Sequence, residues 1–314
     1  RVHPAWVVPG GVNAPLDPEW HEFIMSMLPD ALERIRRTLD WYKDIFGNFA
    51  DEIRTFANFP SLFMGMVNED GELEMYEGML RIVDAKGETV ADGLDPRNYM
   101  DFIGEYVEPD SYLKSPYYKP LGYPDGMYRV GPLARMNIVD RIGTPMADQE
   151  WAEFRALERG PELSSFHYHY ARLIEILYTI ERMERELNHP DIFSERVRAF
   201  AQPNRDEGVG ASEAPRGTLF HHYRIDKQGL ITWVNMIIAT GNNSMAMNKG
   251  IYQAARHFVR GDKLQEGMLN RVEAVIRCFD PCLSCSTHAF GRMPMEVELK
   301  NRDGEVMDRA SRAM

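Results

Sequence analysis

All three cysteines of this 314-residue chain lie within eight residues, at Cys278, Cys282 and Cys285. A small fold stapled by disulfides spreads its cysteines along the chain, so bridges cannot hold this chain together. It must instead bury a large apolar core, and 44% hydrophobic residues suffice for one or two domains. Clustered thiols in a large acidic chain indicate local chemistry in a reducing compartment, and we expect a cytoplasmic protein.

The charge balance excludes two classes of partner. The chain has 36 basic and 48 acidic residues and a net charge of −12, so neither nucleic acid nor an anionic membrane is expected to bind it. No apolar run approaches the roughly 20 residues of a membrane span. The strongest run, residues 233–240, has the length of a strand.

Three stretches carry apolar residues at steps of three and four, the spacing of one helix face. They span residues 30–57, 162–188 and 265–279, and we expect the second to be the longest helix. Pro29 gives a start signal for the first, and Pro281 ends the third.

Three pairs of strand-like runs flank turn-forming tetrapeptides and predict hairpins: residues 61–67 with 73–85, 218–225 with 230–240, and 293–300 with 305–307. Residues 95–107 are predicted to form a short helix and residues 108–135 an ordered loop. Gly208 and Gly210 are placed in another loop. The predicted fold class is mainly α with small β elements (α+β).

The most informative motif spans residues 280–288, Asp-Pro-Cys-Leu-Ser-Cys-Ser-Thr-His. Two thiols three residues apart can converge on one metal ion, thiolates favour soft or borderline metals, and His288 adds a further donor. Half of a zinc site, a redox dithiol and part of another transition-metal centre all fit the spacing. A zinc site needs a second ligand pair, and only Cys278 remains. A thioredoxin-like dithiol opens a helix, whereas this motif follows one.

The nonapeptide resembles the C-terminal signature of nickel–iron hydrogenase large subunits, Asp-Pro-Cys-x-x-Cys-x-x-His. Further segments resemble the same family, in consistent order along the whole chain: His3-Pro4 with residues 8–12, Gly131–Asn137, Glu213–Gly217 and His221–Arg224. Two of these, residues 131–137 and 221–224, are similar in particular to the bidirectional, NAD-linked cytoplasmic group. The fold expected from this resemblance is the helical core of a hydrogenase large subunit.

The resemblance implies reversible heterolytic cleavage of H2 to protons and electrons at a Ni–Fe(CN)2CO centre. Cys282 would be a terminal nickel ligand and the first proton acceptor, and Cys285 would bridge nickel to iron. His288 would bind Mg2+ near the mature C-terminus. Nickel chemistry suits thiolates because they are soft and electron-rich and can take up a proton while bound.

Three further residues acquire roles from the resemblance. Arg216 matches the arginine suspended over the diatomic ligands, where a permanently charged guanidinium can donate to cyanide nitrogens. Asp280 would pair with Arg216 and hold its geometry. Pro215 would close the apolar wall of the pocket.

The family also implies processing and partners. A nickel-dependent maturation endopeptidase would cut after His288, so residues 1–288 would form the mature region and residues 289–314 a removable C-terminal extension. The chain lacks cysteines for iron–sulfur clusters, which implies an iron–sulfur small subunit, and the expected reduction of NAD implies a diaphorase module. Gly208-Val209-Gly210 has no third glycine in position, so we expect no NAD or flavin on this chain.

The chain departs from the family pattern at its front. It begins at Arg1 in an apolar stretch. The N-terminal Cys-x-x-Cys and a proton-relaying glutamate of the family are missing, so we expect a truncated chain that is inactive alone.

The alternatives to an NAD-linked hydrogenase subunit are an F420-reducing or sulfhydrogenase-type large subunit, a metal-free relative in complex I, which lacks the cysteines, and a zinc-stabilised interaction domain.

Residues outside these motifs are expected to have structural roles. His221 and His222 should face opposite sides of a strand, because side chains alternate there. Cys278 is expected to lie in the core, and His167 and His169 to have packing or surface roles.

Overall fold

The computed structural model describes residues 7–109, 111, 113–200, 204–282 and 295–312. Cys285, His288 and the His3-Pro4 pair therefore lie outside the described residues, and the predictions made for them stay predictions.

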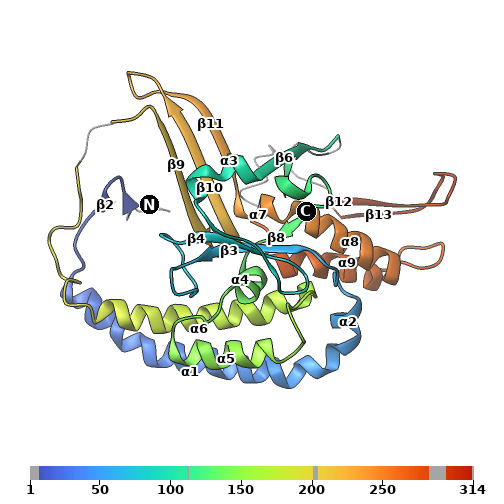
Figure 1. Ribbon diagram of the computed structural model, residues 1–314. Coiled ribbons are helices and arrows are strands. Elements are labelled where there is room, and N and C mark those ends of the chain that lie inside the picture. Colours follow the sequence, from blue (N-terminus) through green and yellow to red (C-terminus); the bar gives the residue numbers. More distant parts are fainter. Residues whose placement is uncertain (1–6, 110, 112, 201–203, 283–294, 313–314) are drawn as a thin grey trace.

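Helices form most of the lower part of the molecule (Figure 1). The α-helices are α1 (Pro18–Phe46), α2 (Ala50–Thr55), α3 (Tyr99–Phe102), α4 (Pro132–Ile138), α5 (Pro145–Arg155), α6 (Tyr168–Leu187), α7 (Ala239–Asn242), α8 (Ser244–Phe258) and α9 (Glu266–Phe279). Short 3-10 turns are η1 (Gly47–Phe49), η2 (Pro96–Asn98), η3 (Lys119–Leu121) and η4 (Ser165–His167).

The strands form several small sheets. They are β1 (Val7–Val8), β2 (Gly11–Val12), β3 (Leu62–Val67), β4 (Met79–Val83), β5 (Thr89–Leu94), β6 (Ile103–Val107), β7 (Lys114–Tyr118), β8 (Tyr128–Arg129), β9 (Glu207–Ala214), β10 (Gly217–Ile225), β11 (Ile231–Ile237), β12 (Met295–Lys300) and β13 (Val306–Arg312). Their orders are β5-β4-β3-β8, β11-β10-β9, β1-β2, β6-β7 and β12-β13. The predicted α+β class is confirmed, and so are the three predicted hairpins.

Strand β3 divides the core into two hydrophobic clusters. All six of its residues are buried. Phe63 and Val67 face a cluster formed largely by helices, whereas Leu62, Met64 and Met66 face a second cluster built with β10, β11 and α3. This alternation follows from the period of two along a strand. The same strand thus fixes the helical layer against the sheet that carries one half of the site.

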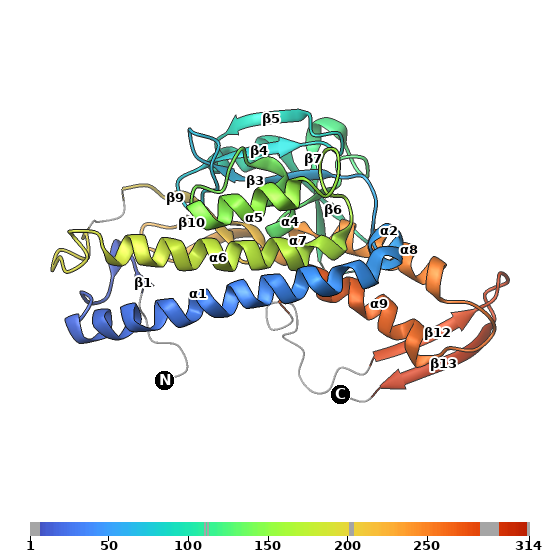
Figure 2. The ribbon, with the colours of Figure 1, turned by 90° about the horizontal axis from the view of Figure 1, so that it is seen from below.

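Helix α1 runs antiparallel to α6 along the helical layer (Figure 2). The apolar stripe predicted for α1 is confirmed, with Ile35, Leu39 and Tyr42 buried. The predicted start was wrong, because α1 begins at Pro18, where the side chain of Asp17 accepts a hydrogen bond from the backbone nitrogen of Glu19 at 2.8 Å.

Pro29 lies inside α1 and does not begin it. Helix α6 starts at Tyr168, later than predicted, and has 20 residues against the 29 of α1. The prediction that it would be the longest helix was therefore wrong, because α1 begins well before residue 30. The prediction for α9 is confirmed, with its end at Phe279.

Three predictions for connecting segments were wrong. Residues 95–107 form a 3-10 turn, one helical turn and strand β6, and the predicted loop at 108–135 contains β7, β8 and the start of α4. Gly208 and Gly210 lie in strand β9. Strand β8 pairs with the distant strand β3, whereas β7 and β9 pair with the neighbouring strands β6 and β10. A local apolar period reveals none of these partners.

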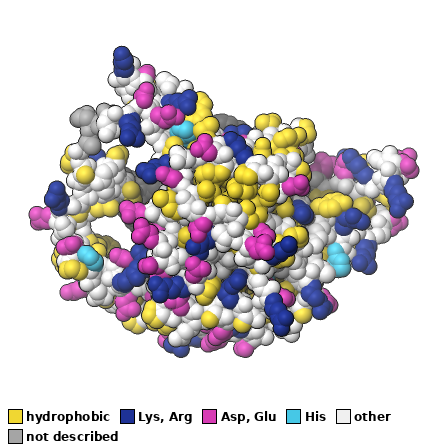
Figure 3. Space-filling model, in the orientation of Figure 1, with side chains coloured by type: hydrophobic (Ala, Val, Ile, Leu, Met, Phe, Trp, Pro, Cys, Tyr) yellow, Lys and Arg dark blue, Asp and Glu magenta, His cyan; other side chains and the backbone are white. Residues whose placement is uncertain are grey.

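The outer surface is mixed in charge. On the face shown in Figure 3, acidic and basic side chains are interspersed, and hydrophobic side chains gather near the middle. Among the helices of the described residues, none combines the length and the apolarity that crossing a bilayer requires.

Leu39 is 1% exposed and packs in the helical core. We expect Leu39→Ala to lower the free energy of unfolding by about 2–5 kcal/mol, because it leaves a cavity between α1 and α6. The control Arg37→Ala, at an exposed position of α1, should change it by less than about 0.5 kcal/mol. Denaturant unfolding measures both, and equal effects would contradict the placement of α1.

Candidate metal centre

The structure brings together two site residues that are far apart in the sequence. Arg216 lies in the tight turn between β9 and β10, and Asp280 follows the last residue of α9. The Nε atom of Arg216 lies 3.2 Å from Oδ2 of Asp280 and also donates to the Asp280 backbone carbonyl. Both side chains are partly exposed, at 34% and 44%. The predicted Arg216–Asp280 contact is thus present in the structure.

The end of helix α9 determines where Cys282 lies. Asp280 adopts a left-handed conformation, with φ 50° and ψ 53°, which aspartate tolerates better than most residues. Pro281 prevents the helix from continuing. The chain turns, and the backbone nitrogen of Cys282 donates to Oγ1 of Thr240, at the start of α7, over 3.2 Å. The end of α9 is therefore fixed to the segment that follows β11.

Arg135 holds the other half of the site in place. Its side chain, on α4, is 1% exposed and donates to the backbone carbonyls of Ala214 and Pro215 at 3.1 and 3.2 Å. These are the two residues that precede Arg216. Because a guanidinium has five donors in a rigid plane, it fixes both carbonyls at once.

Two buried carboxylates neutralise Arg135. Its Nη2 lies 2.8 Å from Oε2 of Glu175 on α6, and its Nη1 lies 2.6 Å from Oε2 of Glu213 on β9. Burial alone lowers the pKa of Arg135, but the two carboxylates more than reverse this and raise it. Burial raises the pKa of Glu213, while Arg135 and a hydrogen bond from Thr218 act in the opposite direction. The three charges are therefore mutually dependent.

Two glycines allow the Arg216 turn to approach α4. Gly131 has φ 89°, and a Cβ there would lie 2.6 Å from the carbonyl oxygen of Arg216. Gly217 has φ 137°, and its Cβ would lie 2.1 Å from a methyl group of Val130. Larger residues would push the two segments apart. Asn243 Nδ2 joins the same segments, since it donates to the carbonyls of Val130 and Arg216 at 3.3 and 3.5 Å.

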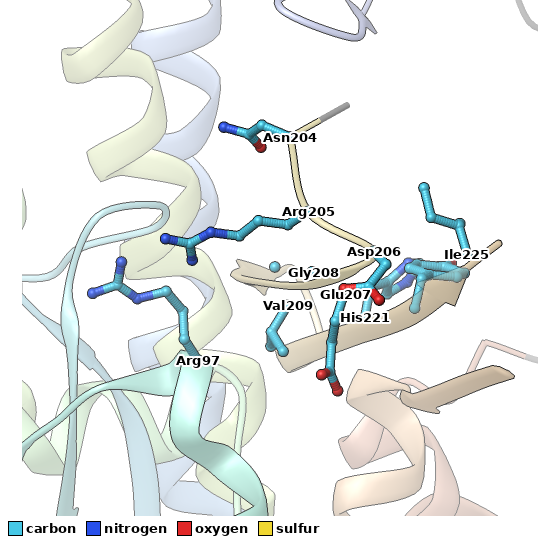
Figure 4. A pocket seen from close by; sticks show the side chains of 11 residues that line it. Arg97, Asn204, Arg205, Asp206, Glu207, Gly208, Val209, His221 and Ile225 are labelled. Atoms are coloured by element: carbon cyan, nitrogen blue, oxygen red, sulfur yellow. The ribbon is translucent and has the colours of Figure 1, made fainter. Parts of the chain in front are cut away.

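A cavity of about 160 Å3 lies beside Cys282. Apolar residues of β7 and β11 and their flanking loops make most of its wall, and Glu105 and Lys114 supply charge. Pro215 is exposed and is not among the residues that line this cavity. A much larger hollow, of about 940 Å3, lies against β9 and β10 and contains none of the predicted site residues (Figure 4).

Cys278 has a packing role. It is 1% exposed, its Sγ lies 3.5 Å from Nε2 of His169, and burial raises the pKa of its thiol to about 12. Arg172 donates to the Cys278 carbonyl at 3.1 Å. Two residues of α6 thus hold the end of α9 just before Asp280. The core placement predicted for Cys278 is confirmed.

The histidines behave largely as expected. His222 is buried and the neighbouring His221 is half-buried on the other face of β10, as predicted. His167 is buried beside Glu162, with 3.1 Å between Nε2 and Oε2. Within the ranges that the structure describes, no group of three or more His, Cys, Asp or Glu side chains could hold a metal ion by itself.

Comparisons with known proteins give a consistent result. The profile of the nickel-dependent hydrogenase family matches residues 51–288, about three quarters of the chain. The beta subunit of the NAD-reducing hydrogenase HoxS of Cupriavidus necator is 37% identical over 324 residues, which cover 99% of this chain and 66% of that protein.

This chain belongs to the nickel-dependent hydrogenase family. One subunit of the F420-non-reducing hydrogenase of Methanothermobacter thermautotrophicus is also 37% identical, over 97% of this chain and 64% of that protein. A crystal structure of an NAD+-reducing NiFe hydrogenase in the H2-reduced state gives a TM-score of 0.85 at 38% identity, over 90% of this chain and 63% of that one. The chain spans just under two thirds of the length of these hydrogenases.

The sequence motifs of this hydrogenase-family chain revealed Arg216 and Asp280 but not the residues that position them. Arg135 was quoted only as part of a resemblance, His169 was expected to have only a packing or surface role, and Glu175 and Arg172 were not singled out. One signal was available for Glu175. It lies between the apolar residues Ile174 and Leu177 of α6 and is itself buried, and a charge on the core face of a helix needs a buried partner.

We expect Arg135→Met to lower the free energy of unfolding by about 3–5 kcal/mol, because it leaves two buried carboxylates without their cation. The control Arg141→Met removes a more exposed ion pair with Glu72 and should cost less than about 1 kcal/mol. Thermal and denaturant unfolding measure the difference. A loss no larger than that of the control would show that the triad is not an integral part of the fold.

Stability should also depend on pH through His169. Burial, followed by Arg172, lowers its pKa from 6.5 to about 4. Between these values the unfolded chain binds a proton that the folded chain does not, so stability is full above pH 6.5 and falls as pH drops towards 4. His169→Gln should reduce this fall by about 3 kcal/mol. The exposed His257→Gln should leave it unchanged, and equal pH profiles for both variants would contradict the burial of His169.

Proposed function

We propose that this chain is part of the catalytic subunit of a nickel–iron hydrogenase that cleaves H2 reversibly and heterolytically into two protons and two electrons. The observation that carries the proposal is the joining of Arg216 to Asp280 immediately before Cys282. Family membership supports the reaction class, since the relatives are named as hydrogenases. Cys282 and Cys285 would hold nickel, with Cys285 also bridging to iron.

The described residues fit such a centre. Cys282 is half-buried and lines a cavity, and a thiolate is a suitable ligand for a soft or borderline metal. The side-chain hydrogen bonds of Arg216 to described residues use Nε, so its terminal nitrogens would be the donors to the centre. When bound, the nickel–iron centre supplies the two-electron chemistry of H2.

The protein's own groups would perform the remaining tasks. The Cys282 thiolate would hold a proton after cleavage. Arg216 would donate to cyanide groups on iron, and Asp280, which already fixes Nε, would keep the guanidinium plane oriented. The largely apolar cavity beside Cys282 would limit access of water. The Fe(CN)2CO unit and Mg2+ at His288 are parts of this proposal that rest on the family alone. The role of Pro215 in a pocket wall also rests on the family, since Pro215 is exposed and does not line the cavity described beside Cys282.

The electron acceptor that we propose is NAD, reached through partner subunits. The support is the relationship to a protein named as a component of an NAD-reducing hydrogenase and to the structure of an NAD+-reducing enzyme. The chain's three cysteines are accounted for by the core and the nickel ligands, so iron–sulfur clusters would lie on a small subunit, and NAD and flavin on a diaphorase module. Use of NAD suggests a cytoplasmic location.

We also propose that residues 289–314 are removed after His288 by a nickel-dependent endopeptidase. The family match ends at residue 288, which supports this boundary. Strands β12 and β13 form a hairpin that projects from the body of the protein in Figure 1. Such a peripheral element could be removed without disrupting the core. Mass spectrometry of the nickel-loaded enzyme tests the cut, and an intact extension in active enzyme would refute it.

The main test is metal loading of the polypeptide that carries this sequence, matured with its accessory proteins and partner subunits. Cys282→Ser should lower nickel content and H2-dependent dye reduction by about tenfold or more, because an alcohol is a poor ligand for nickel. The control Cys278→Ala should retain its nickel. Metal analysis and infrared bands of iron-bound CO and CN− are the readouts.

Arg216→Lys separates metal binding from catalysis. We expect nickel content to be retained and turnover to fall by about 10²–10³-fold, since a lysine cannot offer the planar set of donors. Finding zinc and no nickel in the wild-type protein would refute the proposed function, and so would full activity in both Cys282→Ser and Arg216→Lys.

A further inference from the structure

A line of hydrogen-bonded side chains begins at the cavity beside Cys282. Glu105 and Lys114 line that cavity, and Lys114 Nζ lies 2.7 Å from Oε1 of Glu105. Asn235 binds both, since it accepts from Lys114 at 3.0 Å and donates from Nδ2 to Oε2 of Glu105 at 2.8 Å. The Glu105 side chain is 18% exposed. A partly buried carboxylate therefore opens onto the same space as Cys282.

The line continues through two buried residues. Nδ2 of Asn235 also donates to Tyr99 Oη at 3.0 Å, and Tyr99 Oη lies 3.2 Å from Nδ1 of His222. Since Tyr99 accepts from Asn235, its own hydrogen is free to point at His222. His222 and Asn235 are directly paired across β10 and β11, so the sheet register places them side by side.

The outer end of the line reaches solvent. Nε2 of His222 lies 2.8 Å from Oε1 of Glu207, and the Glu207 side chain is 46% exposed. Glu207 belongs to the hollow of about 940 Å3, where its carboxylate points away from Arg97 and Arg205 (Figure 4). Hydrogen bonds from Arg224 and His222 lower the pKa of Glu207. An ionised acceptor therefore ends the line.

The surroundings of the line are apolar. The ring of Phe220 stacks on Tyr99 with 5.1 Å between centroids, and Trp233 meets His222 edge-on at 4.7 Å. Tyr99 and His222 are 1% and 4% exposed. Buried polar groups are costly unless they are satisfied, and from Asn235 outward the hydrogen bonds can run in one direction, through Tyr99 and His222 to Glu207.

We propose that Glu105, Tyr99, His222 and Glu207, with Asn235 as a positioning residue, conduct protons between the Cys282 cavity and the surface. This inference rests on the proposed function, which releases protons next to Cys282. The line joins the two hollows, one beside the expected nickel ligand and one open to solvent.

The transfer moves one proton and no electrons. The Glu105 carboxylate accepts a proton from the cavity and passes it to Tyr99 Oη through a bridging water molecule that the proposal adds, since both groups accept from the same nitrogen of Asn235. Tyr99 Oη releases its own hydrogen to Nδ1 of His222, Nε2 releases its hydrogen to Glu207, and Glu207 loses it to bulk water. His222 ends in its other tautomer, and its ring turns over before the next transfer. H2 production uses the same steps in reverse.

Tyr99→Phe tests the line because it removes one oxygen atom. Tyr223→Phe is the matched control, since Tyr223 Oη lies 2.9 Å from Nδ1 of His221 on the same strand but outside the line. In the matured enzyme, Tyr99→Phe and Glu207→Gln should each slow H2 turnover about tenfold or more and raise the solvent deuterium isotope effect. The infrared bands of CO and CN− should stay unchanged, and Tyr223→Phe should stay within about twofold of wild type.

Turnover and isotope effects in Tyr99→Phe and Glu207→Gln that match those of Tyr223→Phe would overturn the proposal. If the Tyr99→Phe variant loses the infrared bands, it cannot test the line. The Glu207→Gln variant, which changes a partly exposed group, then tests it by the same comparison of H2 turnover and isotope effect with Tyr223→Phe.

A second measurement needs no metal. In the 15N-labelled chain without nickel, His222 should carry its hydrogen on Nε2, and Tyr99→Phe should alter this tautomer preference whereas Tyr223→Phe should not. A hydrogen on Nδ1 in the wild-type chain would contradict the proposed direction of the line. If matured wild-type enzyme shows neither CO and CN− bands nor H2 uptake, the proposed function fails, while the tautomer measurement still tests the line separately.

Discussion

The buried guanidinium of Arg135 connects the parts of the fold that the site needs. It joins α4 to Glu175 on α6 and to Glu213 on β9, and it fixes the two carbonyls that precede Arg216. Burying one cation and two carboxylates is costly, and only their mutual contacts and additional hydrogen bonds offset the lost hydration. Through this interaction, the packing of the helices determines where Arg216 lies, and Arg216 in turn contacts Asp280.

Helix α6 contributes to both halves of the site. Glu175 supports the Arg216 turn through Arg135, while His169 and Arg172 hold Cys278 at the end of α9. A rigid helix thus spans the distance between two segments that must meet. Positions set by helices and strands are more reproducible than positions set by loops alone, which suits a centre whose ligands come from distant parts of a chain.

Local signals predicted part of the fold, and long-range packing determined the rest. The hairpins were predictable because their turn tetrapeptides are local. Helix α8 was missed because its buried face consists of Ala246, Gly250 and Ala254, at steps of four, and such small residues do not form an apolar stripe. A Cβ on Gly250 would lie 2.7 Å from that of Ala57, which explains the small residues. In the site, resemblance paired Arg216 with Asp280, but no local pattern links Arg135 to the turn that it holds.

The central claim is that Cys282 binds nickel beside the Arg216–Asp280 pair. X-ray absorption at the nickel edge of the matured enzyme measures the sulfur ligands directly. Nickel should have several sulfur neighbours in the wild-type enzyme, and any nickel retained by the Cys282→Ser variant should have one sulfur fewer. An unchanged sulfur shell in that variant, or nickel surrounded only by oxygen and nitrogen in the wild-type enzyme, would contradict the account.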